Sequence, residues 1–146
     1  MTESDNIEYT IVMTKKDGYK FEIDFGKETI ANLLMDEPKE VPGGEGKGPN
    51  ASMLLATAVG HCLSASLTFC LTKKRVELKE LRTKIRLKRE RNDDGFWRIL
   101  KIDVDLEPIV EDVKNEHFLR CSEIFRNYCI VSSSIESGIP INVNML

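Results

Sequence analysis

The hydrophobic pattern opens with three short stretches in which apolar and polar residues alternate. They are IEYTIVM from Ile7, YKFEIDF from Tyr19 and ETIANLLM from Glu28. Such alternation is typical of strands with one buried face. Turn residues at 16–18 and 26–27 separate the stretches. The pattern therefore predicts a meander of three short antiparallel strands.

A loop and a long apolar segment follow. Residues 36–50, DEPKEVPGGEGKGPN, hold three of the five prolines and four of the nine glycines, so we expect no regular structure there. Loops of this length are more often functional than idle. Asn50 or Ser52 is a suitable cap for a helix from about Ala51 to Lys74. Apolar residues on nearly every face predict that this helix is buried on most sides.

The same segment is the one candidate membrane span in the sequence. Met53 to Leu71 is about 19 residues, long enough to cross a bilayer. Its serines, threonines and His61 make it only moderately apolar, and the predicted strands need a helix to cover them. We therefore expect a core helix and no membrane association.

The second half of the chain predicts a hairpin, two helices and a strand. ELRTKIRLKRE and FWRILKIDVDLEP alternate around the turn NDDG, and Pro108 is expected to end the second arm. Helical spacing runs from Glu111 to Tyr128, with a break near Cys129. VSSSIESG predicts a short helix closed by Gly138, and IPINVNM a final strand.

Composition is that of an ordinary globular protein. The 146 residues are 41% hydrophobic and 31% charged, and they are expected to form one domain over 1–146. The net charge of −3 argues against a protein that mainly holds nucleic acid. The acidic N-terminus MTESDNIEYT has no signal pattern, which predicts a cytoplasmic protein.

One basic segment runs against this acidic total. Residues 73–91 hold ten Lys or Arg against three Glu, and four of the cations share one strand face: Arg82, Lys84, Arg86 and Lys88. Such a row can meet phosphate in nucleic acid or lipid. It is more often a solvated face or pairs with an acidic strand, here around Asp103, Asp105 and Glu107. We expect no nucleic-acid partner.

The four cysteines form two pairs with the same offset of eight residues: Cys62 and Cys70, then Cys121 and Cys129. Zinc sites use closely spaced cysteines, so a metal is a minor alternative. A structural disulfide is disfavoured in a reducing cytosol, where a bond between the halves would be transient and catalytic. Free cysteines often serve as small buried hydrophobes. Cys70 and Cys121, among apolar neighbours, fit that interpretation.

Cys62 and Cys129 have different surroundings. Cys62 follows Gly60 and His61, at a point where another backbone could approach closely. Cys129 follows Arg126 and precedes the predicted short helix, and both features favour a thiolate.

The order of these parts resembles the OsmC/Ohr family. DEPKEVPGGEGKGPNASMLLATAVGHCLSASL is similar to the family's glycine-rich loop and central helix with the first cysteine, and CSEIFRNYCIVSSSIESGIPINV is similar to its second half. The resemblance implies an α+β fold, with antiparallel sheets around a long central helix, that is stable as an intertwined homodimer. It also implies reduction of organic hydroperoxides without a metal or other cofactor.

In that chemistry Cys62 would be the peroxidatic and Cys129 the resolving cysteine, with a sulfenic acid between them. A dithiol, possibly of the lipoyl type, would be the reductant by analogy. The sequence departs from the peroxidase members at two places: Ser52 stands where they have a glutamate, and no arginine precedes Arg75. An apolar setting raises the pKa of a thiol, so some cation must oppose this effect.

The candidates for this support are Lys47, Arg126 and basic side chains of a second subunit, with Glu45 as an orienting carboxylate. Each could equally be a solvated surface charge. We expect His61 to be packed or interfacial rather than the base, since neighbouring helix residues point about 100° apart. Loss of the family's Glu and Arg leaves an alternative from another class, a non-catalytic dimer that binds a small apolar ligand beneath the GGEGKG loop.

Overall fold

The computed structural model describes residues 6–146, in two compact units that meet in sequence at Leu54 and Leu55. The cytoplasmic prediction used the N-terminal segment MTESDNIEYT, and its first five residues lie outside the described residues. Each unit is described by itself. The single domain expected over 1–146 stays a prediction.

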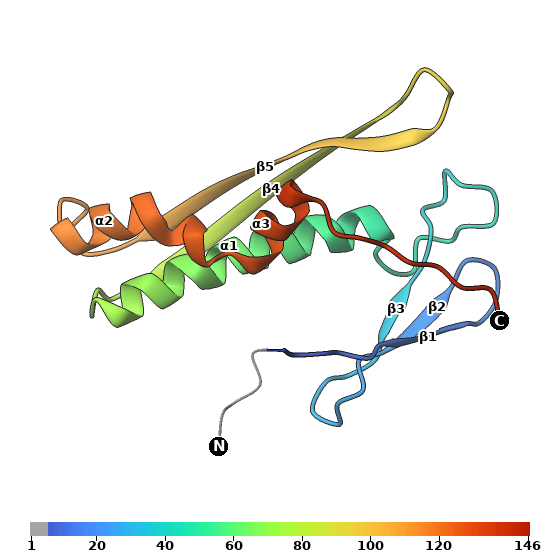
Figure 1. Cartoon of the computed structure of the whole chain (residues 1–146), viewed down its shortest axis with the longest axis horizontal. Helices are drawn as coiled ribbons and strands as arrows, with labels where there is room; N and C mark the ends of the chain where they lie inside the picture. Colours follow the sequence, from blue (N-terminus) through green and yellow to red (C-terminus); the bar gives the residue numbers. More distant parts are fainter. Residues whose placement is uncertain (1–5) are drawn as a thin grey trace. The chain divides into compact units, whose positions relative to one another are not determined.

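The first unit contains the expected meander (Figure 1). Its strands are β1 (Val12–Lys15), β2 (Phe21–Asp24) and β3 (Leu33–Met35), paired antiparallel in that order. Each is shorter than its alternating stretch. Ile7, Tyr9 and Ile11, which precede β1, are exposed and lie in no strand.

The loop from 36 to 50 has no regular structure and is organised by one buried carboxylate. Asp36 accepts backbone N–H groups from Glu37 at 2.8 Å, Glu45 at 3.3 Å and Lys47 at 3.0 Å. The Lys47 N–H has the largest effect on the carboxyl pKa of Asp36, which lies below its usual value despite burial. The loop is therefore an ordered turn system around Asp36.

The second unit is built on the long helix α1 (Ala51–Lys73) and the hairpin of β4 (Glu80–Arg91) and β5 (Trp97–Ile109). Asn50 caps α1, as predicted, by accepting the Met53 N–H at 2.9 Å. β5 continues through Pro108, which pairs with Leu81, so the expected end of the strand at Pro108 is wrong. Together with the meander, these elements confirm the α+β class with antiparallel sheets and a long helix.

One face of the hairpin covers α1, and the other carries charge. Ile102 and Val104 of β5 pack with Val59 and Leu63 of α1. On the outer face Arg82 pairs with Glu107 at 3.9 Å and Arg86 with Asp105 at 2.5 Å. The basic residues of β4 thus pair with the acidic residues of β5, which was one of the interpretations of the basic row given above.

The hairpin and the helices around it leave part of α1 uncovered. Seven of its 23 residues are buried, whereas Ala58, His61, Ala65 and Phe69 are exposed in the single chain. The prediction of burial on most sides is therefore wrong for the chain by itself. Within residues 6–146, α1 is the one helix whose length and composition would suit a membrane span. Leu67 and Leu71, on its buried face, belong to the core.

The C-terminal third consists of α2 (Glu116–Ile124), a 3-10 turn η1 (Phe125–Tyr128) and α3 (Ile130–Ser137). α2 begins five residues later than Glu111, because the Asp112 side chain accepts the Lys114 N–H and Asn115 caps the helix. Gly138 closes α3 at φ 82°, as expected. The predicted final strand is absent from residues 139–146, which find no pairing partner within the described chain.

Gly60 sets the distance between α1 and β4. A Cβ at this position would lie 2.5 Å from Cδ1 and 2.6 Å from Cγ1 of Ile85. One turn later, the Ser64 and Thr83 hydroxyls join the same two elements at 2.6 Å. From the sequence, another backbone was expected to approach Gly60; a close approach is found, but the neighbour is the side chain of Ile85.

We expect Gly60→Ala to lower the free energy of unfolding by about 1–2 kcal/mol. Overpacking costs about 1–3 kcal/mol, while alanine returns up to about 1 kcal/mol of helix propensity. Urea denaturation measures the change. In the Gly60→Ala/Ile85→Val double variant the nearest atom is gone, so its loss should be smaller than the sum of the single losses. A Gly60→Ala protein more stable than the wild type would contradict this packing.

Candidate active site

Cys62 lies on α1 with its sulfur directed at the start of α3. Its helix neighbours Val59 and Leu63 are buried, and Cys62 packs against their cluster while remaining partly accessible. The Val131 backbone N–H reaches the Cys62 Sγ at 3.5 Å. α1 thus presents this thiol to the N-terminus of a second helix.

Cys129 is the N-cap residue of that helix. Its backbone is extended (φ −81°, ψ 101°), which ends η1 and begins α3. The Cys129 Sγ accepts the Ser132 N–H at 3.4 Å, the geometry that a serine or aspartate oxygen takes at an N-cap. The side chain is 1% exposed. The predicted break at Cys129 is therefore a capped helix start, with the sulfur as the cap.

The two sulfurs accept consecutive N–H groups at the start of α3, Val131 for Cys62 and Ser132 for Cys129, and their ionisation differs. Burial raises the pKa of Cys62 above its usual value, and the hydrogen bond of this thiol to Cys129 acts in the same direction. Burial also opposes ionisation of Cys129, but hydrogen bonds from the Ser132 hydroxyl, the Ser132 N–H and the Cys62 thiol outweigh it and lower the pKa. The first negative charge of the pair therefore resides on Cys129.

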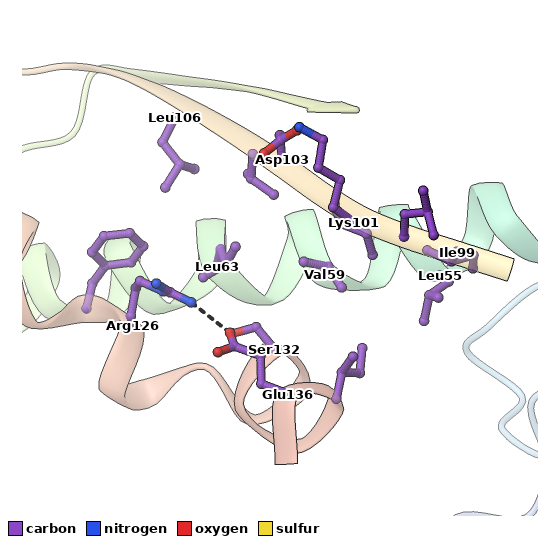
Figure 2. Close-up of a pocket in the computed structure, with 15 residues that line it drawn as sticks. Leu55, Val59, Leu63, Ile99, Lys101, Asp103, Leu106, Arg126, Ser132 and Glu136 are labelled. Atoms are coloured by element: carbon purple, nitrogen blue, oxygen red, sulfur yellow. Dashed lines mark hydrogen bonds and ion pairs between the residues drawn. The ribbon is translucent and has the colours of Figure 1, made fainter. Parts of the chain in front are cut away.

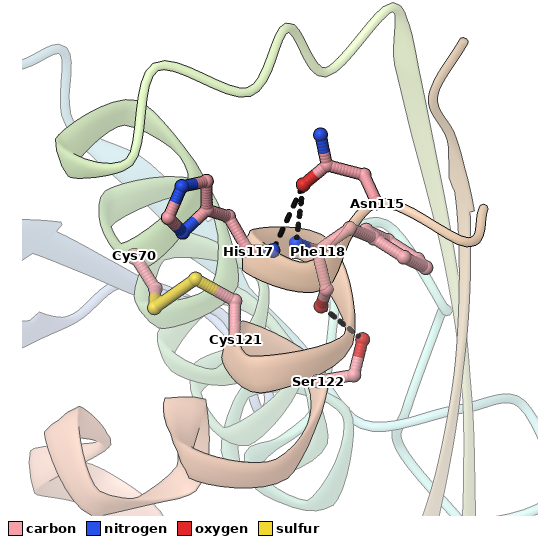
Figure 3. Close-up of a disulfide and its surroundings, with 6 residues drawn as sticks. All are labelled: Cys70, Asn115, His117, Phe118, Cys121 and Ser122. Atoms are coloured by element: carbon pink, nitrogen blue, oxygen red, sulfur yellow. Dashed lines mark hydrogen bonds between the residues drawn. A yellow bond between two sulfur atoms is a disulfide. The ribbon is translucent and has the colours of Figure 1, made fainter. Parts of the chain in front are cut away.

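The other two cysteines form a disulfide. Cys70 of α1 and Cys121 of α2 are bonded, with their Cα atoms 5.7 Å apart (Figure 3). They are 4% and 0% exposed, in the core cluster of Leu67 and Leu71. The prediction that they act as separate small hydrophobes is right about their location and wrong about their chemistry. α2 packs on the end of α1 so that the two thiols meet inside the core.

The equal offsets of eight residues now have a structural meaning. The segment from α2 to α3 runs along α1 in the opposite direction (Figure 1). Eight residues beyond Cys62 on α1 is Cys70, and eight residues before Cys129 is its partner Cys121. The disulfide and the free pair are thus two contacts between the same two antiparallel segments.

A cavity of about 580 Å³ lies beside the free pair, between α1, β5 and α3 (Figure 2). Leu55, Val59 and Leu63 line it from α1, and Ile102, Val104 and Leu106 from β5. Ser132, which bonds the Cys129 sulfur, also lines it. The cavity is therefore a mainly apolar space that adjoins the pair through Val59, Leu63 and Ser132, with neither cysteine in its lining.

Charged groups at this cavity occur in pairs. Arg126 binds Glu136 at 2.8 Å, and Lys101 binds Asp103 at 3.1 Å. Both pairs are largely exposed. Arg126, a predicted supporting residue, thus reaches the cavity next to Cys129 but is engaged with a carboxylate.

Two other predicted supporting residues lie in the first unit. Glu45 is paired with Lys20, and the backbone of Lys47 contributes to the turn around Asp36, with its side chain exposed. Their role at Cys62 stays a prediction. His61 is exposed on the single chain, so it is not packed there.

Sequence reasoning missed Ser132, which donates both its N–H and its hydroxyl to Cys129. The sequence does contain a pattern that could have indicated this contact, because a residue three positions after an N-cap lies within reach of the cap side chain. Among the described residues, no group of three His, Cys, Asp or Glu side chains could hold a metal ion.

Residues 44–144 match the family described as OsmC-like protein. The chain belongs to the OsmC-like family. No functionally curated protein shows significant sequence similarity to it. The fold of this OsmC-like protein is similar to that of an OsmC-like protein of unknown function from Vibrio cholerae, at a TM-score of 0.75 and 11% identity, over 90% of this chain and 95% of that one.

Two further solved structures share the OsmC-like fold. One is an OsmC-like protein from Mycoplasma pneumoniae, with a TM-score of 0.73 and 15% identity over 91% of this chain and 89% of that one. The other is an organic hydroperoxide resistance protein from Elizabethkingia anophelis, with a TM-score of 0.64 and 16% identity over 90% and 89%. At these low identities, the TM-scores show a common fold and nothing further about the OsmC-like protein.

Proposed function

We propose that this OsmC-like protein is a thiol peroxidase that reduces organic hydroperoxides with Cys62 as the peroxidatic and Cys129 as the resolving cysteine. The contact between the two thiols is the observation that carries the proposal. A sulfenic acid on one sulfur would have the other within bonding reach, so a disulfide can form without a large movement. Relatives of the same fold named for hydroperoxide resistance support this reaction class.

In this reaction Cys62 attacks the terminal oxygen of the hydroperoxide, the O–O bond breaks and an alcohol leaves. Cys129 then attacks the Cys62 sulfenic acid, an S–S bond forms and water leaves. A dithiol, of which the lipoyl type is one candidate, returns both thiols in exchange for its own disulfide. Each turnover moves two electrons from the sulfurs to the peroxide.

The apolar cavity supports an organic substrate. Nine aliphatic side chains line it, and even about 60 Å² of buried apolar surface is worth about 1.5 kcal/mol, or more than tenfold in binding. We also propose a homodimer, because a second copy could cover apolar side chains that the single chain exposes, among them Ile139, Ile141 and Val143.

We expect the purified protein with dihydrolipoamide to reduce cumene hydroperoxide at least about tenfold faster than hydrogen peroxide. Only the organic peroxide has apolar surface that the cavity can bury. Thiols should be counted before and after one equivalent of peroxide, under denaturing conditions. Two thiols should become none, and mass spectrometry of peptides should identify the new bond as Cys62–Cys129. Turnover without loss of these thiols would contradict the two-cysteine mechanism.

The cavity also supports a second function, the binding of a small apolar ligand without chemistry. Its lining comes from α1, β5, η1 and α3 and includes no residue of the GGEGKG loop, beneath which the ligand was expected from the sequence. It predicts that the protein consumes no hydroperoxide and keeps its two thiols, while an apolar fluorescent probe binds in the cavity. A charged side chain in the cavity wall, as in Val104→Glu, should then abolish probe binding. The peroxide assay therefore separates the two functions.

A further inference from the structure

The two thiols differ in what surrounds them, and the difference concerns activation. Cys129 accepts two donors from Ser132 and one from Cys62. Cys62 accepts the Val131 N–H at 3.5 Å and a backbone hydrogen bond from Ile130, and within residues 6–146 no side-chain hydroxyl donates to it. The two sulfurs therefore accept the N–H groups of consecutive residues, Val131 and Ser132, at the start of α3, which places them together.

The charged groups around the pair are otherwise occupied. Arg126 of η1 and Glu136 of α3 neutralise each other, as do Lys101 and Asp103 of β5. On α1, the neighbouring His61 is exposed. Among the described residues that line the cavity beside the pair, no carboxylate or imidazole is left without a partner, so the group that removes the Cys62 proton has to be found within the pair.

We infer that Cys129 acts twice: its thiolate, held by Ser132, first takes the proton of the Cys62 thiol as Cys62 attacks the peroxide, and later attacks the Cys62 sulfenic acid. This rests on the proposed peroxidase function. Ser132 is a positioning residue, since it acts through Cys129. The Cys129 sulfur is a catalytic group in both steps.

The steps balance in atoms and charge. The Cys62 sulfur bonds to the terminal oxygen, the O–O bond breaks, and the Cys62 proton moves to Cys129. The alkoxide takes that proton from Cys129 and leaves as the alcohol. The restored Cys129 thiolate then attacks Cys62, an S–S bond forms, and hydroxide leaves to be protonated by solvent. The reduced dithiol supplies the electrons for the next cycle.

The proton transfer is uphill in the resting protein, where Cys129 is the more acidic thiol. It becomes favourable during the attack, because a sulfur that is forming a bond to oxygen loses its hold on the proton. General base catalysis of this kind contributes about 10²–10⁴-fold to a rate.

The test is the rate of the first step in Cys129→Ser. The prereduced full-length protein is mixed with one equivalent of cumene hydroperoxide, and peroxide consumption is followed together with dimedone labelling of Cys62. Serine is a good N-cap, so the start of α3 should persist. We expect the label to appear on Cys62 about 100-fold more slowly than the wild-type protein consumes its first equivalent.

A rate within twofold of the wild-type value would overturn the base role and leave the proposed peroxidase intact. If neither protein consumes peroxide, the peroxidase proposal fails and this inference fails with it. The two failures are therefore distinct.

Ser132→Ala gives an independent readout with both thiols present. Loss of the hydroxyl should raise the pKa of Cys129, so the rise of the first-step rate with pH should move to higher pH and the rate at neutral pH should fall several-fold. The matched control is Ser133→Ala, an exposed serine on the same turn, whose profile should coincide with that of the wild type. An unshifted profile in Ser132→Ala would contradict the positioning role.

Discussion

Cys62→Ser is expected to abolish hydroperoxide turnover, with a fall in kcat/KM of at least about a thousand-fold. A serine hydroxyl has no ionised form near neutral pH and cannot become a sulfenic acid, so both the nucleophile and the intermediate are lost. Steady-state consumption of cumene hydroperoxide with dihydrolipoamide measures the effect. The buried neighbours Val59 and Leu63 should hold α1 in place, so stability should change little.

Ala65→Ser is the matched control for this substitution. It adds a hydroxyl to the exposed face of the same helix and leaves the thiols unchanged, so its kinetics should equal those of the wild type. Retention of wild-type turnover in Cys62→Ser, with dimedone on Cys129, would exchange the roles of the two cysteines. Retention without any labelled cysteine would reject thiol chemistry altogether.

Cys70→Ala/Cys121→Ala is expected to lower the free energy of unfolding by about 4 kcal/mol, nearly a thousand-fold in the folding equilibrium. The bond joins residues 51 positions apart, and a crosslink that closes a loop of this length removes about that much entropy from the unfolded chain. Guanidinium denaturation of the oxidised proteins measures the difference. The core packing of two small side chains contributes a further, smaller loss.

The same denaturation in excess reductant is the control for the crosslink. The wild type loses its bond there, so the difference between the two proteins should shrink to the packing contribution. A difference that survives reduction would show that these cysteines stabilise the core by packing, as the sequence suggested. Equal stability under oxidising conditions would mean that the bond adds nothing to the native state.

The second consequence of this variant concerns the free pair. Cys121 holds α2 against α1, and only η1 separates α2 from Cys129. Without the bond, the N-terminus of α3 is less firmly held opposite Cys62. We therefore expect slower closure of the Cys62–Cys129 bond, which quenched-flow thiol counts would detect.

Most elements of the fold could be predicted because local signals fix them. Asn50 at the start of α1, the turn NDDG and Gly138 after α3 are each close in sequence to the feature they determine. The final strand could not be predicted correctly, because a strand requires a partner that no local pattern supplies. The start of α2 was displaced for a local reason, the side chain of Asp112.

The residues of the candidate site could be predicted, but their contacts could not. The identities of Cys62 and Cys129 follow from the family resemblance, and the thiol contact agrees with that pairing. The Cys70–Cys121 bond could not be derived, since it depends on how α2 lies on α1. The lowered pKa of Cys129 depends on several hydrogen bonds, first that of the Ser132 hydroxyl, whose direction is set only by the folded chain.

The antiparallel placement of the two cysteine pairs would also limit exchange between them in the proposed reaction. Peroxide would then create a reactive sulfur on Cys62 in every cycle, on the same helix as Cys70 of the core disulfide. Cys62 and Cys70 stand eight residues apart along α1, about 12 Å, whereas a disulfide needs Cα atoms within about 7 Å. A bond between these two cysteines is therefore excluded, and the straight run of α1 keeps the oxidised sulfur away from the half of the core bond that this helix carries.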